Sequence, residues 1–266
     1  MVGGKGMILR RITIHVKEQN WFAVFLDFVI VVIGILIAFQ ITNFSDARRE
    51  KSELRHAEAA IKNDLRRAYF NAKERMSLTD CRIEQLSGLS ERLLEPGDTW
   101  AGTPINTTES WGERAIPTVL RSPSRIWGSR IWNAELSRGT FNRMDAEQRA
   151  ELDSVFEQSR SAELLQDQIL TLQARLKVLS RATVLSRQDR LRYFDTVSEI
   201  DEQSVILELM ASQIAESIEG MDVTPDAETA LQIQDFIESS KAGRQAAYGP
   251  CVKSIELFFL NPVNDD

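Results

Sequence analysis

Histidine and cysteine, which supply many metal ligands and nucleophiles in proteins, are nearly absent from this sequence. Its 266 residues include two histidines, His15 and His56, and two cysteines, Cys81 and Cys251. The histidines flank a long apolar run, so neither a histidine pair nor a His/Cys metal site is expected. No Gly-x-Ser-x-Gly elbow or phosphate-cradling glycine loop occurs either. We therefore expect no catalytic residue, no metal and no cofactor.

Glycine, proline, tyrosine and net positive charge are also scarce. The 13 glycines, 7 prolines and 3 tyrosines favour helix over sheet. The net charge is -7, and since the first 45 residues carry +2, residues 46–266 carry -9. An acidic chain excludes nucleic acid as a partner, because nucleic acid selects basic surfaces. The 43% of hydrophobic residues suffice for one sizeable core or two small domains.

The longest apolar run covers residues 21–39, WFAVFLDFVIVVIGILIAF, and only Asp27 interrupts it. At about 1.5 Å per residue the run spans about 28 Å, close to the roughly 30 Å hydrocarbon core of a bilayer. It is longer than the apolar part of a signal peptide, and no small-x-small cleavage site follows it. We therefore predict an uncleaved transmembrane helix at residues 21–44.

Orientation rests on the basic residues around this span. The tail before it holds four, and four more follow it, interleaved with acids. A short basic tail is readily retained, whereas a large domain is translocated largely regardless of its charge. We expect residues 1–20 in the cytoplasm, with a possible amphipathic helix in the interface, and residues 45–266 on the other side of the membrane.

Three residues inside the span are candidates for helix pairing. Gly34 and Ala38 have the small-xxx-small spacing that lets two backbones approach closely. Asp27 is costly in lipid unless it faces protein or water. Two alternatives stay open: the small residues are four apart by chance, and Asp27 lies in the headgroup zone. The partner would be another protein or a second copy of this chain.

Residues 17–49 carry a resemblance to a known family. Its members share a Lys-Glu-x-x-Trp start, an Asp-Phe pair, an Ile-Val-Val-x-Gly-Ile run and a Gln-x-x-Asn exit. Here the matching residues are Lys17, Glu18, Trp21, Asp27, Phe28, Ile30 to Ile35, Gln40 and Asn43. A Trp-x-x-x-Leu-x-x-Gly stretch, here Trp132, Leu136 and Gly139, extends it. The segment resembles a family of uncharacterised bacterial single-pass inner-membrane proteins. The resemblance implies a location in the bacterial inner membrane and implies no catalytic activity.

The rest of the chain predicts an all-α domain, an antiparallel bundle of about four long helices. We expect helices at residues 46–95, 124–139, 140–219, 224–248 and 252–260. The first of these is either a separate helix or a direct continuation of the membrane helix. A connector rich in Gly and Pro occupies 96–125, Asp145 caps one helix, and a turn interrupts it at 181–187. Leu231, Ile233, Phe236 and Ile237 should face inward. Leu165, Ile169, Leu172, Leu176 and Leu179 form a heptad seam, with which a coiled-coil homodimer is also compatible.

The cysteines and one aromatic segment are the remaining candidates. Cys81 and Cys251 form an even pair in a domain expected outside the cytoplasm, which favours a disulfide worth about 4–5 kcal/mol; two separate buried thiols are the alternative. Segment 125–138 mixes Trp127 and Trp132 with arginines such as Arg130. These side chains could bind an anionic or carbohydrate ligand, or the tryptophans could close one end of the core.

Together these features predict a membrane-anchored structural or interaction protein with no evident catalysis. The alternative is a periplasmic ligand-sensing module that uses segment 125–138 and signals through a partner.

Overall fold

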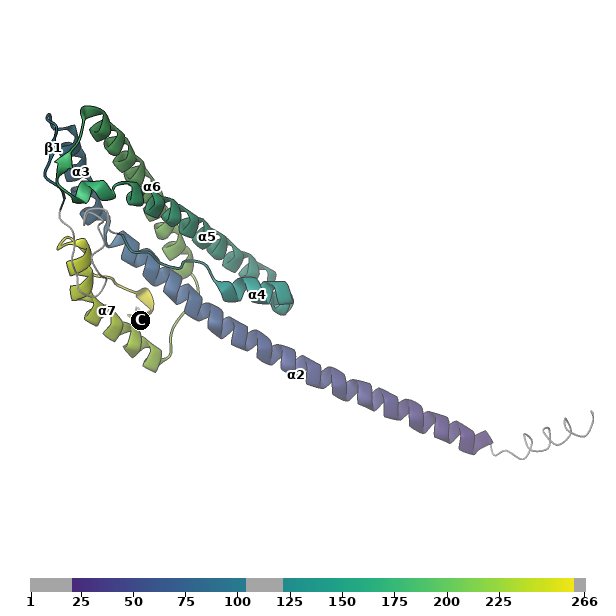
Figure 1. Ribbon diagram of the computed structural model, residues 1–266. Helices are drawn as coiled ribbons and strands as arrows, with labels where there is room; N and C mark the ends of the chain where they lie inside the picture. The colour runs from purple at the N-terminus through teal and green to yellow at the C-terminus, as the bar shows by residue number, and fades with distance from the viewer. Residues whose placement is uncertain (1–20, 104–121, 261–266) are drawn as a thin grey trace, which may run out of the picture. The chain divides into compact units, whose positions relative to one another are not determined.

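The computed structural model describes residues 21–103 and 122–260, and these are mostly helical, as predicted (Figure 1). The α-helices are α2 (Trp21–Met76), α3 (Thr79–Leu94), α4 (Arg130–Arg138), α5 (Ala146–Arg175), α6 (Arg187–Glu219) and α7 (Ala227–Tyr248). The 3-10 turns η2 (Thr140–Arg143) and η3 (Lys177–Ser180) lie between α4 and α5 and between α5 and α6, and η4 (Phe258–Leu260) lies in the tail after α7. Strands β1 (Thr99–Trp100) and β2 (Thr183–Val184) pair antiparallel. The predicted interfacial helix before residue 21 and most of the predicted connector lie outside the described residues.

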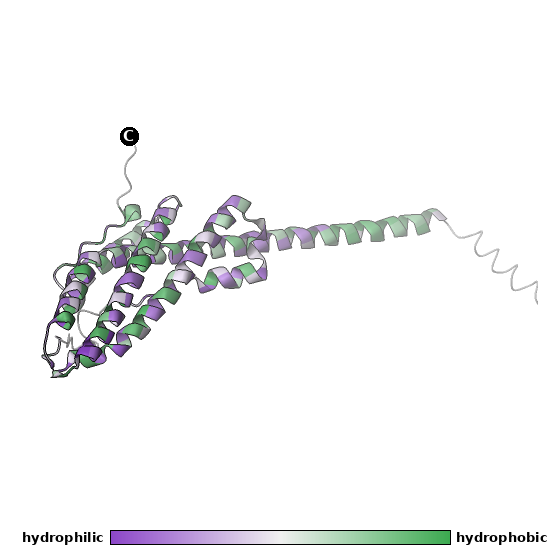
Figure 2. Ribbon diagram, turned by 90° about the horizontal axis from the view of Figure 1, so that it is seen from above, coloured by the Kyte–Doolittle hydropathy of each residue, from purple (hydrophilic) through white to green (hydrophobic). Residues whose placement is uncertain are grey.

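The chain divides into two compact units, Met1–Arg55 and His56–Asp266. Helix α2 continues through this boundary, so the apolar helix runs on without a new cap, as one of the two expected alternatives has it. Its first part contains an 18-residue window with a mean hydropathy of 2.8, none of it buried. Figure 2 shows this part as an almost unbroken hydrophobic ribbon. By length and composition, the helix is able to cross a membrane.

In the second unit, α5 and α6 lie side by side and α3 packs on α6 (Figure 1). The predicted seam of α5 and η3 faces the core: Ile169, Leu172, Leu176 and Leu179 are buried, and Leu165 is half-buried. The predicted turn at 181–187 is present between η3 and α6. Asp145 caps α5 by accepting hydrogen bonds from the N–H groups of Glu147 and Gln148.

The prediction of one helix at 46–95 is wrong in one respect, because the helix ends at Met76 and a new helix begins at Thr79. The carbonyl of Ser77, which a continuing helix would use internally, instead accepts a hydrogen bond of 3.0 Å from the N–H of Lys253. The Ser77 hydroxyl donates to the carbonyl of Glu74 at 2.7 Å. A contact with the distant C-terminal segment thus replaces one turn of helix.

Helix α4 and its flanking residues also differ from the prediction. The helix begins at Arg130 instead of near residue 124, because the Ser129 hydroxyl accepts a hydrogen bond from the N–H of Trp132 and caps it. Its end at Gly139 is as predicted. Gly139 has a φ of 76°, and its N–H bonds the last carbonyls of the helix.

The C-terminal part differs most. Helix α7 starts at Ala227 with Asp226 as its cap, and not with the predicted Thr224–Pro225 pair. The predicted tail helix is instead an extended segment that ends in the short turn η4; Ile255 and Leu257 are buried in the extended part and Phe259 in the turn.

The inward face predicted for α7 is present only in part. Ile233 and Ile237 are half-buried, and the Phe236 ring packs on Phe70 at a ring-centre distance of 5.6 Å, but Leu231 and Phe236 are 64% and 54% exposed. The tail also contributes to the core, since Phe258 and Phe259 pack on the buried ring of Tyr69.

Candidate functional site

The predicted disulfide joins Cys81 on α3 to Cys251, just after α7, across 170 residues of sequence. Their Cα atoms lie 5.2 Å apart. Next to the bridge, the side-chain amide of Gln85 donates a hydrogen bond of 2.8 Å to the carbonyl of Tyr248. The bridge therefore fastens the end of α7 and the start of the tail to α3. An oxidised pair is consistent with a domain outside the cytoplasm.

The three helix-pairing candidates lie along one side of α2. In a continuous helix, the spacings of seven from Asp27 to Gly34 and four from Gly34 to Ala38 bring the residues onto one face. All three are exposed, and a side chain added at Gly34 would meet no atom within 4 Å. One turn further on, the Thr42 hydroxyl donates to the carbonyl of Ala38 at 3.0 Å. This small and polar stripe is open to a second helix.

The two tryptophans of segment 125–138 belong to the core. Trp127 and Trp132 are 1% and 2% exposed. Trp132 stacks on Phe141 and Phe156, at ring-centre distances of 4.8 and 5.4 Å. The indole N–H of Trp127 donates to Gln166 at 3.1 Å. Both indole rings are therefore covered by other side chains, which agrees with the alternative that the tryptophans close one end of the core.

A cavity of about 270 Å³ nevertheless lies between α4 and α5, beside this segment. Trp132 contributes to its wall, and the exposed Arg130 lies at its edge together with Arg160 and Glu163. Trp127 is not part of the wall. Of the predicted ligand residues, the structure brings Arg130 and Trp132 to the cavity and leaves Trp127 in the core.

The most elaborate polar arrangement of the domain was not predicted from the sequence. Glu74, on α2, is 1% exposed, and its two carboxylate oxygens accept hydrogen bonds of 2.6 and 2.7 Å from Arg125. Glu208, on α6, accepts two from Arg82 of α3, at 2.7 and 3.1 Å. Arg82 also pairs with Asp201. These bidentate pairs connect α2, α3, α6 and the segment before α4.

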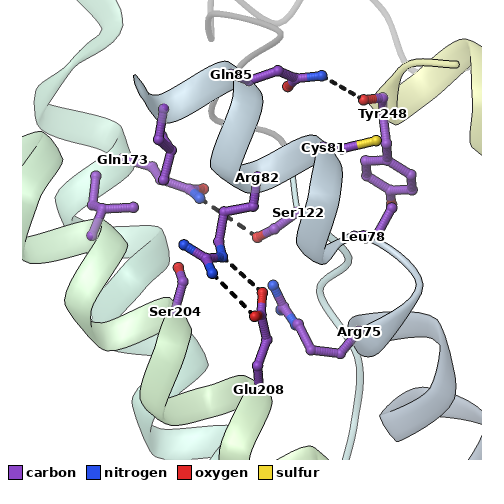
Figure 3. Close-up of a pocket in the computed structure, with 12 residues that line it drawn as sticks. Arg75, Leu78, Cys81, Arg82, Gln85, Ser122, Gln173, Ser204, Glu208 and Tyr248 are labelled. Carbon is purple, nitrogen blue, oxygen red and sulfur yellow. Dashed lines mark hydrogen bonds and ion pairs between the residues drawn. The ribbon is translucent and has the colours of Figure 1, made fainter. Parts of the chain in front are cut away.

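Arg75 lies beside these pairs, and its side chain reaches toward Glu208 from α2 (Figure 3). It is 4% exposed, and one of its terminal nitrogens donates to the carbonyl of Pro123 at 3.1 Å. Burial lowers the pKa of Arg75 to about 10, against the opposing effect of the charges of Glu208 and Glu74. The guanidinium therefore remains charged at neutral pH.

One signal in the sequence could have identified two of these arginines. Arg82 has Leu78 and Leu86 four residues away on either side, and Arg75 lies three residues from Leu78. A charged residue at an apolar position of a helix is a candidate for a buried ion pair. The acidic partners could not be identified in this way, because Glu208 is 126 residues from Arg82.

Within residues 21–103 and 122–260, no group of three or more His, Cys, Asp or Glu side chains could hold a metal ion. No family model, no curated protein and no solved structure matches the chain. The resemblance of residues 17–49 to bacterial single-pass membrane proteins therefore stays a prediction.

Proposed function

We propose that this chain is a single-pass protein of the bacterial inner membrane, with its disulfide-bonded helical domain in the periplasm, and that it acts by binding another protein. One observation carries the proposal: the 18-residue apolar window of α2 is left wholly uncovered by the rest of the chain. Lipid or a partner must cover such a surface in the cell. We assign the domain no catalytic chemistry.

The disulfide supports the proposed side of the membrane. Disulfides persist in the periplasm and are rare in the bacterial cytoplasm, where thiols are kept reduced. The bridge between Cys81 and Cys251 closes 170 residues of the domain. The short basic tail before the span, retained in the cytoplasm, supports the same orientation.

The stripe of Asp27, Gly34 and Ala38 supports binding within the membrane. A carboxylate within the hydrocarbon core is costly, and a facing helix with a polar group reduces this cost. Gly34 and Ala38 allow that helix to approach closely. The partner is therefore a second membrane helix, from another protein or from a second copy of this chain.

Thiol labelling tests the orientation. A membrane-impermeant maleimide is added to cells with a permeabilised outer membrane, with and without prior reduction. Cys251 is the more exposed of the pair. It should be labelled only after reduction, while the inner membrane is still intact. A Cys81→Ser, Cys251→Ser variant controls for unspecific reaction. Labelling without reduction, and only after the inner membrane is breached, would reverse the topology and remove the disulfide.

A second experiment tests pairing of the span. Gly34→Leu places a large side chain on the stripe and should reduce cross-linking of the chain to its partner in native membranes several-fold. Val32→Leu enlarges a side chain near the opposite face and should leave cross-linking unchanged. A chain that is a monodisperse monomer without a partner in mild detergent, and that forms no cross-link in membranes, would contradict the proposal.

A second candidate function is ligand sensing, which the cavity between α4 and α5 favours. Its volume of about 270 Å³ approaches the lower limit of small-molecule sites. A screen of sugars, amino acids and lipid headgroups should then raise the melting temperature of the protein. Arg130→Ala should abolish that rise, whereas the exposed Arg138→Ala, at the other end of α4, should retain it. A screen without any stabilising compound would count against this function.

A further inference from the structure

The side chains of α2, α3, α6 and α7 leave a small cavity beside the arginine–glutamate pairs (Figure 3). Its volume is about 30 Å³, whereas one water molecule needs roughly 10–15 Å³ of such space. Arg75, Arg82, Ser204, Glu208 and Tyr248 are among the residues that line it. The cavity is too small for an organic ligand and has room for one monatomic ion or for one or two water molecules.

Arg75 brings an unused hydrogen-bond donor to this cavity. Its Nε is buried and has no partner among the described residues, although a terminal nitrogen of the same guanidinium is bonded to Pro123. A buried N–H without an acceptor costs about 1–3 kcal/mol, and more when the group is charged. An occupant that accepts a hydrogen bond would remove this cost.

The charges around the cavity decide between a neutral and an anionic occupant. The charged residues that line the cavity are Arg75, which is buried, and Arg82 and Glu208, whose side chains are each 13% exposed. Two positive groups and one negative group leave one positive charge on the lining. Asp201, which pairs with Arg82 from outside the lining, is 48% exposed, so solvent screens its charge.

Arg244, on α7, shows the same deficit. It is 7% exposed, and its Nε and one terminal nitrogen are buried without partners among the described residues. Glu74 is the acidic group with the largest effect on it. Arg125 already occupies both oxygens of that carboxylate. The carboxylates nearest to Arg75 and Arg244 are therefore already bound by other arginines, Glu208 by Arg82 and Glu74 by Arg125.

We propose that the cavity binds a single monovalent anion of the chloride class, which accepts a hydrogen bond from Nε of Arg75. The ion balances the excess positive charge of the lining. Held by Arg75 of α2 beside Arg82 of α3, it would stabilise the contact between these two helices. The inference concerns the domain alone and does not depend on the proposed orientation or on partner binding.

Melting curves of the full chain in a non-ionic detergent test the proposal. Chloride or bromide replaces gluconate at constant ionic strength. At about five times its Kd, either halide should raise the melting temperature by about 2–4 °C in a saturable manner. Arg75→Gln should abolish the rise. Arg192→Gln, which changes an exposed arginine of α6, should retain it. Equal melting temperatures in chloride and gluconate would overturn the proposal.

Crystals of the unaltered chain grown with bromide provide a test that does not require Arg75→Gln to fold. An anomalous peak within hydrogen-bond distance of Nε of Arg75 would establish the ion. An ordered water without anomalous signal at that position would show that a neutral molecule fills the cavity, and the proposal would be wrong.

Discussion

Glu74 and Arg75 are neighbours in the sequence, yet they serve different parts of the buried network. Glu74 binds Arg125, before α4, while Arg75 reaches toward Glu208 of α6. Such pairs add little net stability over apolar packing, but they strongly penalise any arrangement that separates them. We interpret the network as fixing how the end of α2 sits against α3 and α6.

Removing one carboxylate of this network should be costly. Glu208→Gln leaves Arg82 with Asp201 as its acidic partner and also removes a negative charge near Arg75. We expect the free energy of unfolding to fall by about 1.5–3 kcal/mol, the usual contribution of hydrogen bonds to charged groups. Urea unfolding of the full chain in detergent, followed by tryptophan fluorescence, measures it.

Glu202→Gln is the matched control, because Glu202 lies on the same helix and is exposed. It should change the free energy of unfolding by no more than about 0.5 kcal/mol. Equal effects of the two substitutions would show that the Glu208 pair contributes nothing specific.

A second carboxylate, that of Glu219, should make the stability of the domain depend on pH. Glu219 accepts a hydrogen bond of 2.6 Å from the hydroxyl of Tyr69 and lies 3.1 Å from the amine of Lys73. The Tyr69 hydrogen bond is the largest effect, and with Lys73 it lowers the pKa of Glu219 below the ordinary 4.5 of a glutamate. A lowered pKa contributes stability that is fully present above about pH 4.5 and is lost as the pH falls through the folded value.

Glu219→Gln should therefore lower stability at pH 6 and flatten its decrease below about pH 4.5. The exposed Glu216→Gln, on the same helix, should leave the shape of the curve unchanged. Melting temperatures measured from pH 6 down to pH 3 compare the variants. A Glu219→Gln curve parallel to that of the unaltered protein would refute this role.

Single residues also mark how far sequence reasoning reaches. The burial of Ile169, Leu172 and Leu176 follows from helical spacing alone, and the structure agrees. The partners of Arg82 and Arg125 do not follow, because 126 and 51 residues separate them from Glu208 and Glu74. Local periodicity identifies which side of a helix is buried, but it does not identify what lies opposite.

At the scale of elements, a pair of glycines provides a matched test of backbone conformation. Gly139 ends α4 at a φ of 76°, and an added Cβ would lie 2.9 Å from the side chain of Asn142. Gly139→Ala should therefore lower the free energy of unfolding by about 1–2 kcal/mol. Gly243 lies inside α7, where an added Cβ meets nothing within 4 Å. Gly243→Ala should raise stability by about 0.5–1 kcal/mol.

Opposite signs in thermal or urea unfolding would confirm both assignments. A destabilised Gly243→Ala variant would show that the space around Gly243 is not open and would contradict this assignment. A neutral Gly139→Ala variant would mean that α4 ends without the left-handed residue.

Element boundaries that local chemistry determines were predictable, and those that distant contacts determine were not. The turn at 181–187 and the end of α4 at Gly139 agree with the structure. The break after Met76 depends on the N–H of Lys253, which is far away in the sequence. The tail reads as an apolar helix by composition, yet it is extended up to η4, because the alternate residues Ile255 and Leu257 are buried and the next two rings, Phe258 and Phe259, pack on Tyr69.

At the scale of the whole molecule, the chain combines an apolar helical segment with an acidic domain. Residues 46–266 carry a net charge of -9, which disfavours binding to anionic lipid headgroups. Attachment to the membrane should therefore depend on the apolar window of α2, none of which is buried.

Fractionation tests this dependence. The full chain should stay in the membrane pellet after alkaline carbonate extraction, because its apolar segment is long enough to span the hydrocarbon core. A chain of residues 46–266, exported behind a cleavable signal, should appear in the soluble periplasmic fraction with its disulfide formed, since it contains the whole unit His56–Asp266. Changing Asp27 to Leu in the full chain is the control and should leave it in the pellet. Release of the full chain by carbonate would contradict the anchor, and pelleting of the shortened chain with membranes would show that the domain itself binds lipid or a membrane protein.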